Sequence, residues 1–318
     1  MTRRKDSSDQ RLDDAARAGW LYYVAGNTQE DIATKLGVSR QTAQRLVSLA
    51  VTEGLIRVRL EHPIAETMDL ADRLGARFGL AHVEVVPSDP ASTSTTLGIA
   101  EAVAVEIERR LRSVEPLVLA MGTGRTLKAA ADLLPRMDCP QHRVVSLTGN
   151  IGPDGSAAYY NVIFSMADAI KARHFPFPLP VFASSADERG LLHGPKLIHD
   201  TLALAASADV SFVGVGELGS AAPLAMDGFL TSAELEALQR AGAVGEIVGW
   251  AFDAEGHLIE GLTNARVASA PIPSRETCLV IGAAMGARKV PALRAALTSQ
   301  LISGLITDEA TATALLAV

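Results

Sequence analysis

The sequence predicts an α/β protein in two parts: an N-terminal winged helix-turn-helix and a larger, doubly wound, mainly parallel α/β domain. Its length of 318 residues exceeds what one domain usually holds. Two short helical patterns joined by a tight turn lie near the N-terminus. Beyond them, apolar strand patterns alternate with helical patterns, as in a parallel sheet covered on both faces. We expect domains over residues 1–61 and 62–318.

Composition and charge narrow the class of protein. Hydrophobic residues make up 48% of the chain and charged residues 20%, which is typical of a soluble globular protein. No apolar run reaches the ~18 residues of a membrane span, so no membrane partner is expected. Cys139 and Cys278 show no CxxC spacing, which argues against a metal site and favours a cytoplasmic location. Residues 1–61 hold 10 Lys/Arg and 8 Asp/Glu, whereas the whole chain has a net charge of −7. This asymmetry is compatible with nucleic-acid contact through the N-terminal part.

The N-terminal part reads as three helices. Apolar residues recur at helical spacing over residues 12–24, and a Gly-Asn pair then breaks the pattern. Thr28 is a good N-cap for a short second helix, which Gly37 ends. Ser39 caps the third helix after only one intervening residue. Two helices joined by so tight a turn predict a helix-turn-helix.

The outward face of the third helix has the chemistry of a DNA reader. Ala43, Leu46 and Val47 would pack on the second helix and turn the polar residues outward. Arg, Gln and Thr side chains bond base edges and phosphates. We predict a DNA-binding set of Thr28, Gln29, Ser39, Arg40, Gln41, Thr42, Gln44 and Arg45. The segment "LIRVRL" predicts a wing strand that exposes Arg57 and Arg59. The alternative is an ordinary helical hairpin with a solvated polar face.

The second part alternates helices and strands in chain order. An amphipathic helix over residues 64–80 ends at Gly79. The expected strands are 81–87, 115–122, 142–152, 179–185, 208–218, 246–256, 278–286 and the start of 304–318. The expected helices are 94–111, 125–134, 159–174, 195–207, 231–242, 288–301 and the end of 304–318. This order predicts a parallel sheet with helices on both faces.

Four glycine-rich segments follow expected strands. They are "GTGRT" (122–126), "TGNIG" (148–152), "GVGEL" (214–218) and "GAAMG" (282–286). In parallel α/β folds, ligands bind beyond the carboxyl ends of the strands. We therefore expect the four segments to converge on one crevice that holds a ligand.

The "GTGRT" segment has the features of an anion cradle. Gly122 and Gly124 let backbone N–H groups approach an anion, and the following helix start adds its dipole. Thr123 and Thr126 offer hydroxyls, and Arg125 offers a charged fork. The segment is neither a Walker A loop nor a GxGxxG fingerprint, so no nucleotide cofactor is expected. The alternative is a tight strand-to-helix turn without a ligand.

Three further residues are candidates for the same crevice. Lys289 follows "GAAMG" and could neutralise an acid or form an imine with an aldehyde sugar. Glu246, at the start of an expected strand, could accept hydrogen bonds from sugar hydroxyls, and Asn150 is a weaker candidate. Each could instead be an ordinary solvated side chain. The histidines show no metal-ligand spacing, so neither a metal nor a cofactor is expected.

Motifs along nearly the whole chain resemble the SorC/DeoR-type sugar-binding transcriptional regulators of bacteria. They are "YYVAGNTQEDIATKLGVSRQTAQRLVSLAVTEGLI", "GTGRTL", "GEIVGWAFDAEG" and "GAAMGARKVPALRAALTSQLISGLITDEATATALL". The chain departs from the family pattern at Glu246, where the family favours Asp, and at Trp250, which is bulkier than expected. Both departures bear on the shape of the pocket.

The resemblance implies a fold and a function. The second domain would be related to sugar-phosphate isomerases, with an effector site lined by residues 122–126, Glu246 and Lys289. Operator DNA would be released or bound again when a sugar, polyol or sugar phosphate binds, and the chain would form dimers or tetramers. The alternative is a sugar-phosphate isomerase or deaminase with an accessory helix-turn-helix. That reaction needs a placed acid and base, and no such spacing is seen after "TGNIG".

Overall fold

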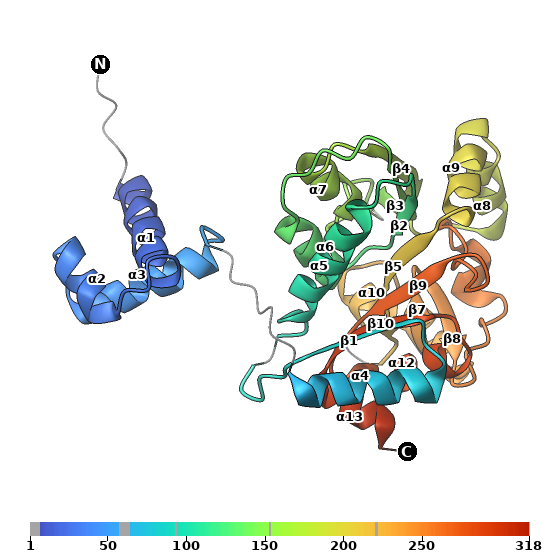
Figure 1. The fold of residues 1–318 in the computed structure, drawn as a ribbon. Coiled ribbons are helices and arrows are strands. Elements are labelled where there is room, and N and C mark those ends of the chain that lie inside the picture. The colour runs from blue at the N-terminus through green and yellow to red at the C-terminus, as the bar shows by residue number, and fades with distance from the viewer. Residues whose placement is uncertain (1–6, 57–63, 93, 153, 220–221, 318) are drawn as a thin grey trace. The chain divides into compact units, whose positions relative to one another are not determined.

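The computed structural model describes residues 7–56, 64–92, 94–152, 154–219 and 222–317 (Figure 1). The chain divides into two compact units, residues 1–62 and 63–318. Each unit has hydrophobic clusters of its own, so each is described by itself.

The described part of the N-terminal unit contains three helices: α1 (Ser7–Tyr23), α2 (Gln29–Leu36) and α3 (Arg40–Thr52). Thr28 caps α2 and Ser39 caps α3, as the sequence predicts. Gly37 ends α2 with a φ of 65°, a conformation that glycine adopts without strain. Buried small residues, including Ala33 and Ala43, let the helices pack closely. The predicted wing residues Arg57 and Arg59 lie outside the described residues.

The larger unit is built on a sheet of seven strands that all pair in parallel. In order across the sheet these are β1 (His82–Val86), β10 (Gly304–Asp308), β9 (Leu279–Ala283), β5 (Val210–Gly214), β2 (Val118–Met121), β3 (Arg143–Ile151) and β4 (Arg173–Pro180). The predicted α/β architecture with a mainly parallel sheet is confirmed.

Helices cover both faces of this sheet (Figure 1). One hydrophobic cluster includes residues of α5 (Ile99–Leu111), α6 (Arg125–Leu133) and α7 (Val162–Ala169). The other includes residues of α4 (Ala65–Phe78), α9 (Lys196–Ala206), α12 (Val290–Thr298) and α13 (Glu309–Leu316). The remaining helices are α8 (Ala186–His193), α10 (Pro223–Met226), α11 (Ser232–Arg240) and the short 3-10 turns η1 (Leu262–Arg266) and η2 (Ala287–Lys289). A sheet buried on both faces explains the continuous apolar runs of β2 and β9.

A second, antiparallel sheet contains β6 (Gly216–Glu217), β7 (Ala243–Ile247) and β8 (Trp250–Asp253). The prediction of one strand over residues 246–256 was wrong, because the chain reverses at Val248 and Gly249. Their φ values of 48° and 92° are positive, as a tight hairpin turn requires at both central residues. A valine rarely adopts this conformation, so its residue type did not signal a turn.

The segment around β4 also differs from the prediction. The helix expected to reach residue 174 ends at Ala169, and the strand expected over 179–185 runs from Arg173 to Pro180. This strand contains Pro176 and Pro178 and lies at the edge of the sheet. Proline cannot donate a ladder hydrogen bond and is tolerated there because one side of the strand is unpaired.

Candidate ligand pocket and DNA-binding face

A pocket lies at the carboxyl ends of the central strands. The chain passes from β2 to β3 on one side, whereas β5 lies on the other side of β2. Such a switch point leaves a crevice where ligands bind in open α/β sheets. The four glycine-rich segments all contribute lining residues, among them Gly124, Gly149, Gly214 and Ala283. They surround a cavity of about 120 Å³.

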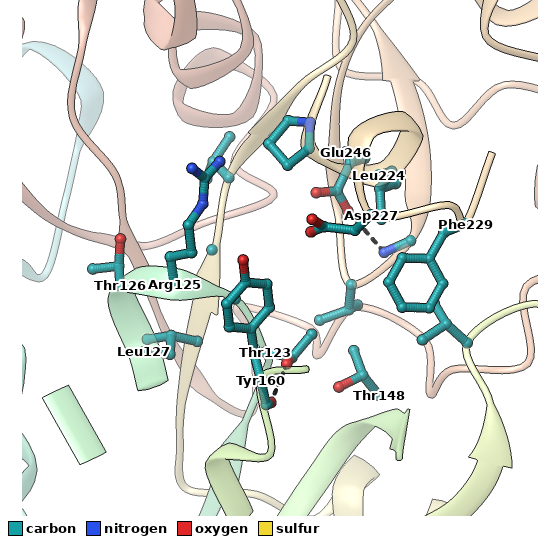
Figure 2. Close-up of a pocket in the computed structure, with 18 of the residues that line it drawn as sticks. Thr123, Arg125, Thr126, Leu127, Thr148, Tyr160, Leu224, Asp227, Phe229 and Glu246 are labelled. Atoms are coloured by element: carbon teal, nitrogen blue, oxygen red, sulfur yellow. Dashed lines mark hydrogen bonds between the residues drawn. The ribbon is translucent and has the colours of Figure 1, made fainter. Parts of the chain in front are cut away.

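The start of α6 forms one wall of the pocket. Gly124, with a φ of 119°, turns the chain into the helix, and Arg125, Thr126 and Leu127 follow in its first turn. The backbone N–H groups of a first helical turn have no partner within the helix, and the helix dipole favours an anion there. The Thr123 hydroxyl donates to the backbone oxygen of Tyr160 at 2.6 Å (Figure 2), so its hydrogen is already used.

Two of the predicted site residues do not line the pocket. The N–H of Gly122 donates to the backbone oxygen of Phe212 at 2.8 Å, so it is not free for an anion. The side-chain oxygen of Asn150 accepts from the N–H of Phe177 at 2.8 Å and ties β3 to β4. Both predictions identified a suitable residue type but not the partner that occupies it.

Glu246 and Lys289 both reach the pocket. Glu246 lies near the end of β7, not at a strand start, and its carboxylate accepts from the N–H of Gly249 at 2.8 Å. Burial raises the pKa of Glu246, against the opposing effects of that N–H group and Lys289. Burial likewise lowers the pKa of Lys289, against the attraction of Glu246. The two groups therefore share a poorly solvated space, which a polar ligand could complete.

The hairpin turn that follows Glu246 is strained and packs against the pocket. The turn residue Val248 has a φ of 48°, a conformation that costs a β-branched residue about 1–3 kcal/mol. Its side chain is buried and lines the pocket. A methyl group built on Gly122 would lie 3.4 Å from it, so the hairpin packs directly on the start of the "GTGRT" segment.

Several pocket residues were not predicted from the sequence. Tyr160 follows β3, and Leu224, Asp227 and Phe229 come from α10 and the turn after it. Figure 2 shows the carboxylates of Asp227 and Glu246 on one side of the space, with Arg125 and the Tyr160 hydroxyl on the other. The only sequence signal near Asp227 was the turn-forming "MDG", which does not indicate a ligand.

Most of these polar groups have no partner within the described part of the chain. The guanidinium of Arg125, the hydroxyl of Tyr160, the carboxylate of Asp227 and the ammonium of Lys289 form neither a hydrogen bond nor an ion pair with any described residue. Arg125 is exposed and the other three side chains are half-buried. Polar groups that lose contact with water normally find other partners. A cluster of such groups around one cavity indicates a site built for a polar ligand.

The predicted DNA-binding face divides into two sets. The hydroxyl of Thr28 is hydrogen-bonded to Asp31, and the hydroxyls of Ser39 and Thr42 lie 2.9 Å apart. These three groups stabilise helix starts. The other set is exposed and forms no side-chain hydrogen bond within the described part of the chain: Arg40, Gln41, Gln44 and Arg45. Gln29 is half-buried at the first position of α2.

Among the described residues, no helix is both long and apolar enough to cross a membrane. No group of three or more His, Cys, Asp or Glu side chains in this part of the chain is placed to hold a metal ion.

A helix-turn-helix followed by an α/β domain with a polar pocket defines the class of a ligand-responsive DNA-binding protein. The family described as "Putative sugar-binding domain" matches residues 62–317, and a homeodomain-like domain matches residues 9–59. The chain belongs to the SorC/DeoR-type family of sugar-binding transcriptional regulators.

Known proteins resemble the chain over nearly its full length. The erythritol catabolism regulatory protein EryD of Brucella abortus is 32% identical, over 95% of this chain and 96% of its own. The transcriptional regulator LsrR of Escherichia coli K12 is 31% identical, over 95% and 93%. The full-length sorbitol operon regulator SorC of Klebsiella pneumoniae shares the fold with a TM-score of 0.69 and 24% identity, over 96% and 99%.

Proposed function

We propose that this protein regulates a carbohydrate or polyol catabolic operon and that a sugar, polyol or sugar phosphate bound in the pocket switches it. The names of EryD and SorC, an erythritol and a sorbitol regulator, support this class of ligand. The proposal extends to the site residues: Thr123 to Leu127, Glu246 and Lys289 for the effector, and α3 for the operator.

The observation that carries the proposal is the set of polar groups around the pocket that have no partner among the described residues. Arg125 and the first turn of α6 supply donors for an anionic end of the ligand. Asp227 and Glu246 supply acceptors for hydroxyl groups. A compact compound with many hydroxyls satisfies both sides, whereas an apolar compound would leave them desolvated and unpaired.

The switch would act through the spacing of recognition helices in a homo-oligomer, a dimer or a tetramer, in the cytoplasm. Operator half-sites lie at helical-turn spacing, so a displacement of a few ångströms between two copies of α3 weakens binding. The ligand shifts this equilibrium only through its different affinities for the two arrangements.

The test has two parts. Thermal unfolding of the full chain with a panel of sugars, polyols and their phosphates identifies ligands, because a ligand stabilises the state that it binds. A DNA duplex selected from a random pool by the full chain then serves in gel shifts with and without that ligand. We expect the ligand to change duplex affinity and salt to lower it steeply. A duplex affinity that the ligand leaves unchanged would contradict the proposal.

One observation favours a second function, a sugar-phosphate isomerase or deaminase. The sequence offered no acid–base pair, but the structure brings Asp227 and Glu246 to one side of the pocket with Lys289 nearby. Groups with shifted pKa values in a cleft are typical of catalytic sites. Against this, no histidine is among the described residues that line the pocket. Turnover of ribose, glucosamine or fructose phosphates by the purified chain would favour the enzyme.

A further inference from the structure

Asp227 occupies a special place in the pocket. It directly follows α10, and Gly228, with a φ of 78°, turns the chain back so that the N–H of Phe229 donates to the backbone oxygen of Leu224 at 2.8 Å. Leu224 and Phe229, which precede and follow Asp227 in the sequence, also line the pocket. This small turn therefore aims the carboxylate into the cavity and keeps it there.

The carboxylate of Asp227 has an electrostatic environment but no bonding partner. It accepts no hydrogen bond and forms no ion pair with any residue that the structure describes. The pKa of Tyr160 is raised by burial and by the negative charge of Asp227, and lowered by Arg125, so these three groups face the same space. Arg125 and Asp227 do not reach each other, which leaves room for a ligand between them (Figure 2).

The charges on the two sides of the cavity are opposite. Arg125 and the start of α6 favour an anion on one side. Asp227 and Glu246 lie together on the other side (Figure 2). Glu246 and Lys289 attract each other there, whereas Asp227 adds a negative charge that no described residue pairs with. Hydroxyl groups can donate to these carboxylates, but a phosphate or carboxylate group of the ligand would be repelled.

We infer that Asp227 is a specificity residue that accepts hydroxyl groups at the end of the ligand far from Arg125 and rejects a second anionic group there. The inference rests on the proposed ligand site. It narrows the effector class to neutral polyhydroxy compounds or to those with one phosphate. Bisphosphates and phosphorylated sugar acids are excluded.

The experiment measures selectivity with matched probes. Dissociation constants are determined for the full chain and for Asp227→Asn with fructose 6-phosphate and fructose 1,6-bisphosphate, ribulose 5-phosphate and ribulose 1,5-bisphosphate, and unphosphorylated fructose and erythritol. Asparagine keeps the shape and a hydrogen-bonding oxygen but removes the charge. We expect the natural protein to prefer the singly phosphorylated or neutral probe. In Asp227→Asn, affinity for the bisphosphate relative to that probe should rise at least about tenfold.

Two control variants separate charge from structure. Asp227→Glu keeps the charge and should still reject the bisphosphate. Asp200→Asn removes an exposed carboxylate of α9, paired with Lys196 outside the pocket, and should leave selectivity unchanged. Because Asp227 has no partner in the described chain, its asparagine variant should melt like the natural protein without ligand, which confirms that it folds.

The outcomes distinguish this inference from the proposed function. If the natural protein binds a probe but Asp227→Asn keeps the same selectivity, Asp227 is not the specificity residue and the site stands. A natural protein that prefers a bisphosphate overturns the inference in the same way. If no probe binds the natural protein, the proposed ligand site fails and the inference fails with it.

Discussion

On the helix-turn-helix, the hydroxyls of Thr28 and Ser39 are hydrogen-bonded at the starts of α2 and α3. In the pocket, the polar ends of Arg125 and Asp227 have no partner in the part of the chain that the structure describes. For both regions the sequence prediction, DNA contact for the first and ligand contact for the second, depended on residue type and position. The difference is that helix formation already uses several polar groups of the first region, whereas those of the second remain available to a ligand.

The largest expected effect concerns the pocket side chains that have no partner among the described residues. Arg125→Ala should weaken the binding of an anionic effector about a hundredfold, close to 3 kcal/mol, because a charge-assisted fork is lost. Calorimetry with the sugar phosphate that most stabilises the natural protein measures it. Arg125→Lys keeps the charge but not the forked guanidinium, so its affinity for the effector should lie between those of the natural protein and Arg125→Ala. Unchanged affinity in Arg125→Ala would remove this residue from the site.

The half-buried carboxylate of Glu84, outside the pocket, gives the next effect. Burial and the charge of Glu106 raise the pKa of Glu84 on β1 to about 7, although Arg109 opposes the shift. A raised pKa means that this group stabilises the fold below the unfolded value near 4.5, and that the contribution is lost as pH rises through 7.

Glu84→Gln removes that titration. It should increase the free energy of unfolding by about 2 kcal/mol at pH 8 and by much less at pH 5. The value at pH 8 is smaller than the full pKa shift would give, because the side chain is partly exposed to solvent. Thermal or denaturant unfolding at the two pH values measures the change. An equal effect at both pH values would show that the carboxyl does not titrate there.

The exposed set on α3 should matter for DNA alone. Arg45→Ala should weaken binding of the selected duplex about tenfold, or about 1.4 kcal/mol, and leave stabilisation by the sugar ligand intact. Arg45→Lys distinguishes the contact, because lysine restores a phosphate contact but not a bidentate contact to guanine. A gel shift with unchanged affinity in the alanine variant would count against α3 as the reader.

The smallest expected effect concerns the hydroxyl groups that cap helix starts in the N-terminal unit. Ser39→Ala should lower the stability of the N-terminal unit by about 1 kcal/mol through loss of the cap on α3. Ser39→Asn retains a capping oxygen and should restore most of that stability. Helical content followed by circular dichroism measures both. If both variants unfold like the natural chain, the serine does not contribute its stability as a cap.

Local signals account for what the sequence could predict. Caps such as Thr28 and Ser39, and the end of α2 at Gly37, depend on residues only a few positions apart. The parallel strands other than β4 follow from apolar runs separated by helical patterns, which also need no distant information. The same rule placed the glycine-rich segments at one end of the sheet.

The rest depends on contacts that the sequence does not show. Gly122 and Asn150 had the right chemistry, but partners distant in sequence, Phe212 and Phe177, occupy them. Asp227 was missed because its turn lies far from the "GTGRT" segment and comes next to it only after folding. The hairpin at Val248 was missed because packing holds a valine in a conformation that its own preferences oppose.

The turn that carries Leu224, Asp227 and Phe229 lies outside the seven-stranded sheet, between β6 and α11. Three side chains that line the pocket can therefore be exchanged without replacing a residue of a strand or of the helix-turn-helix. For the design of biosensors, this short turn is the place to introduce diversity. A library confined to it would alter which inducer is detected while the output on DNA is kept.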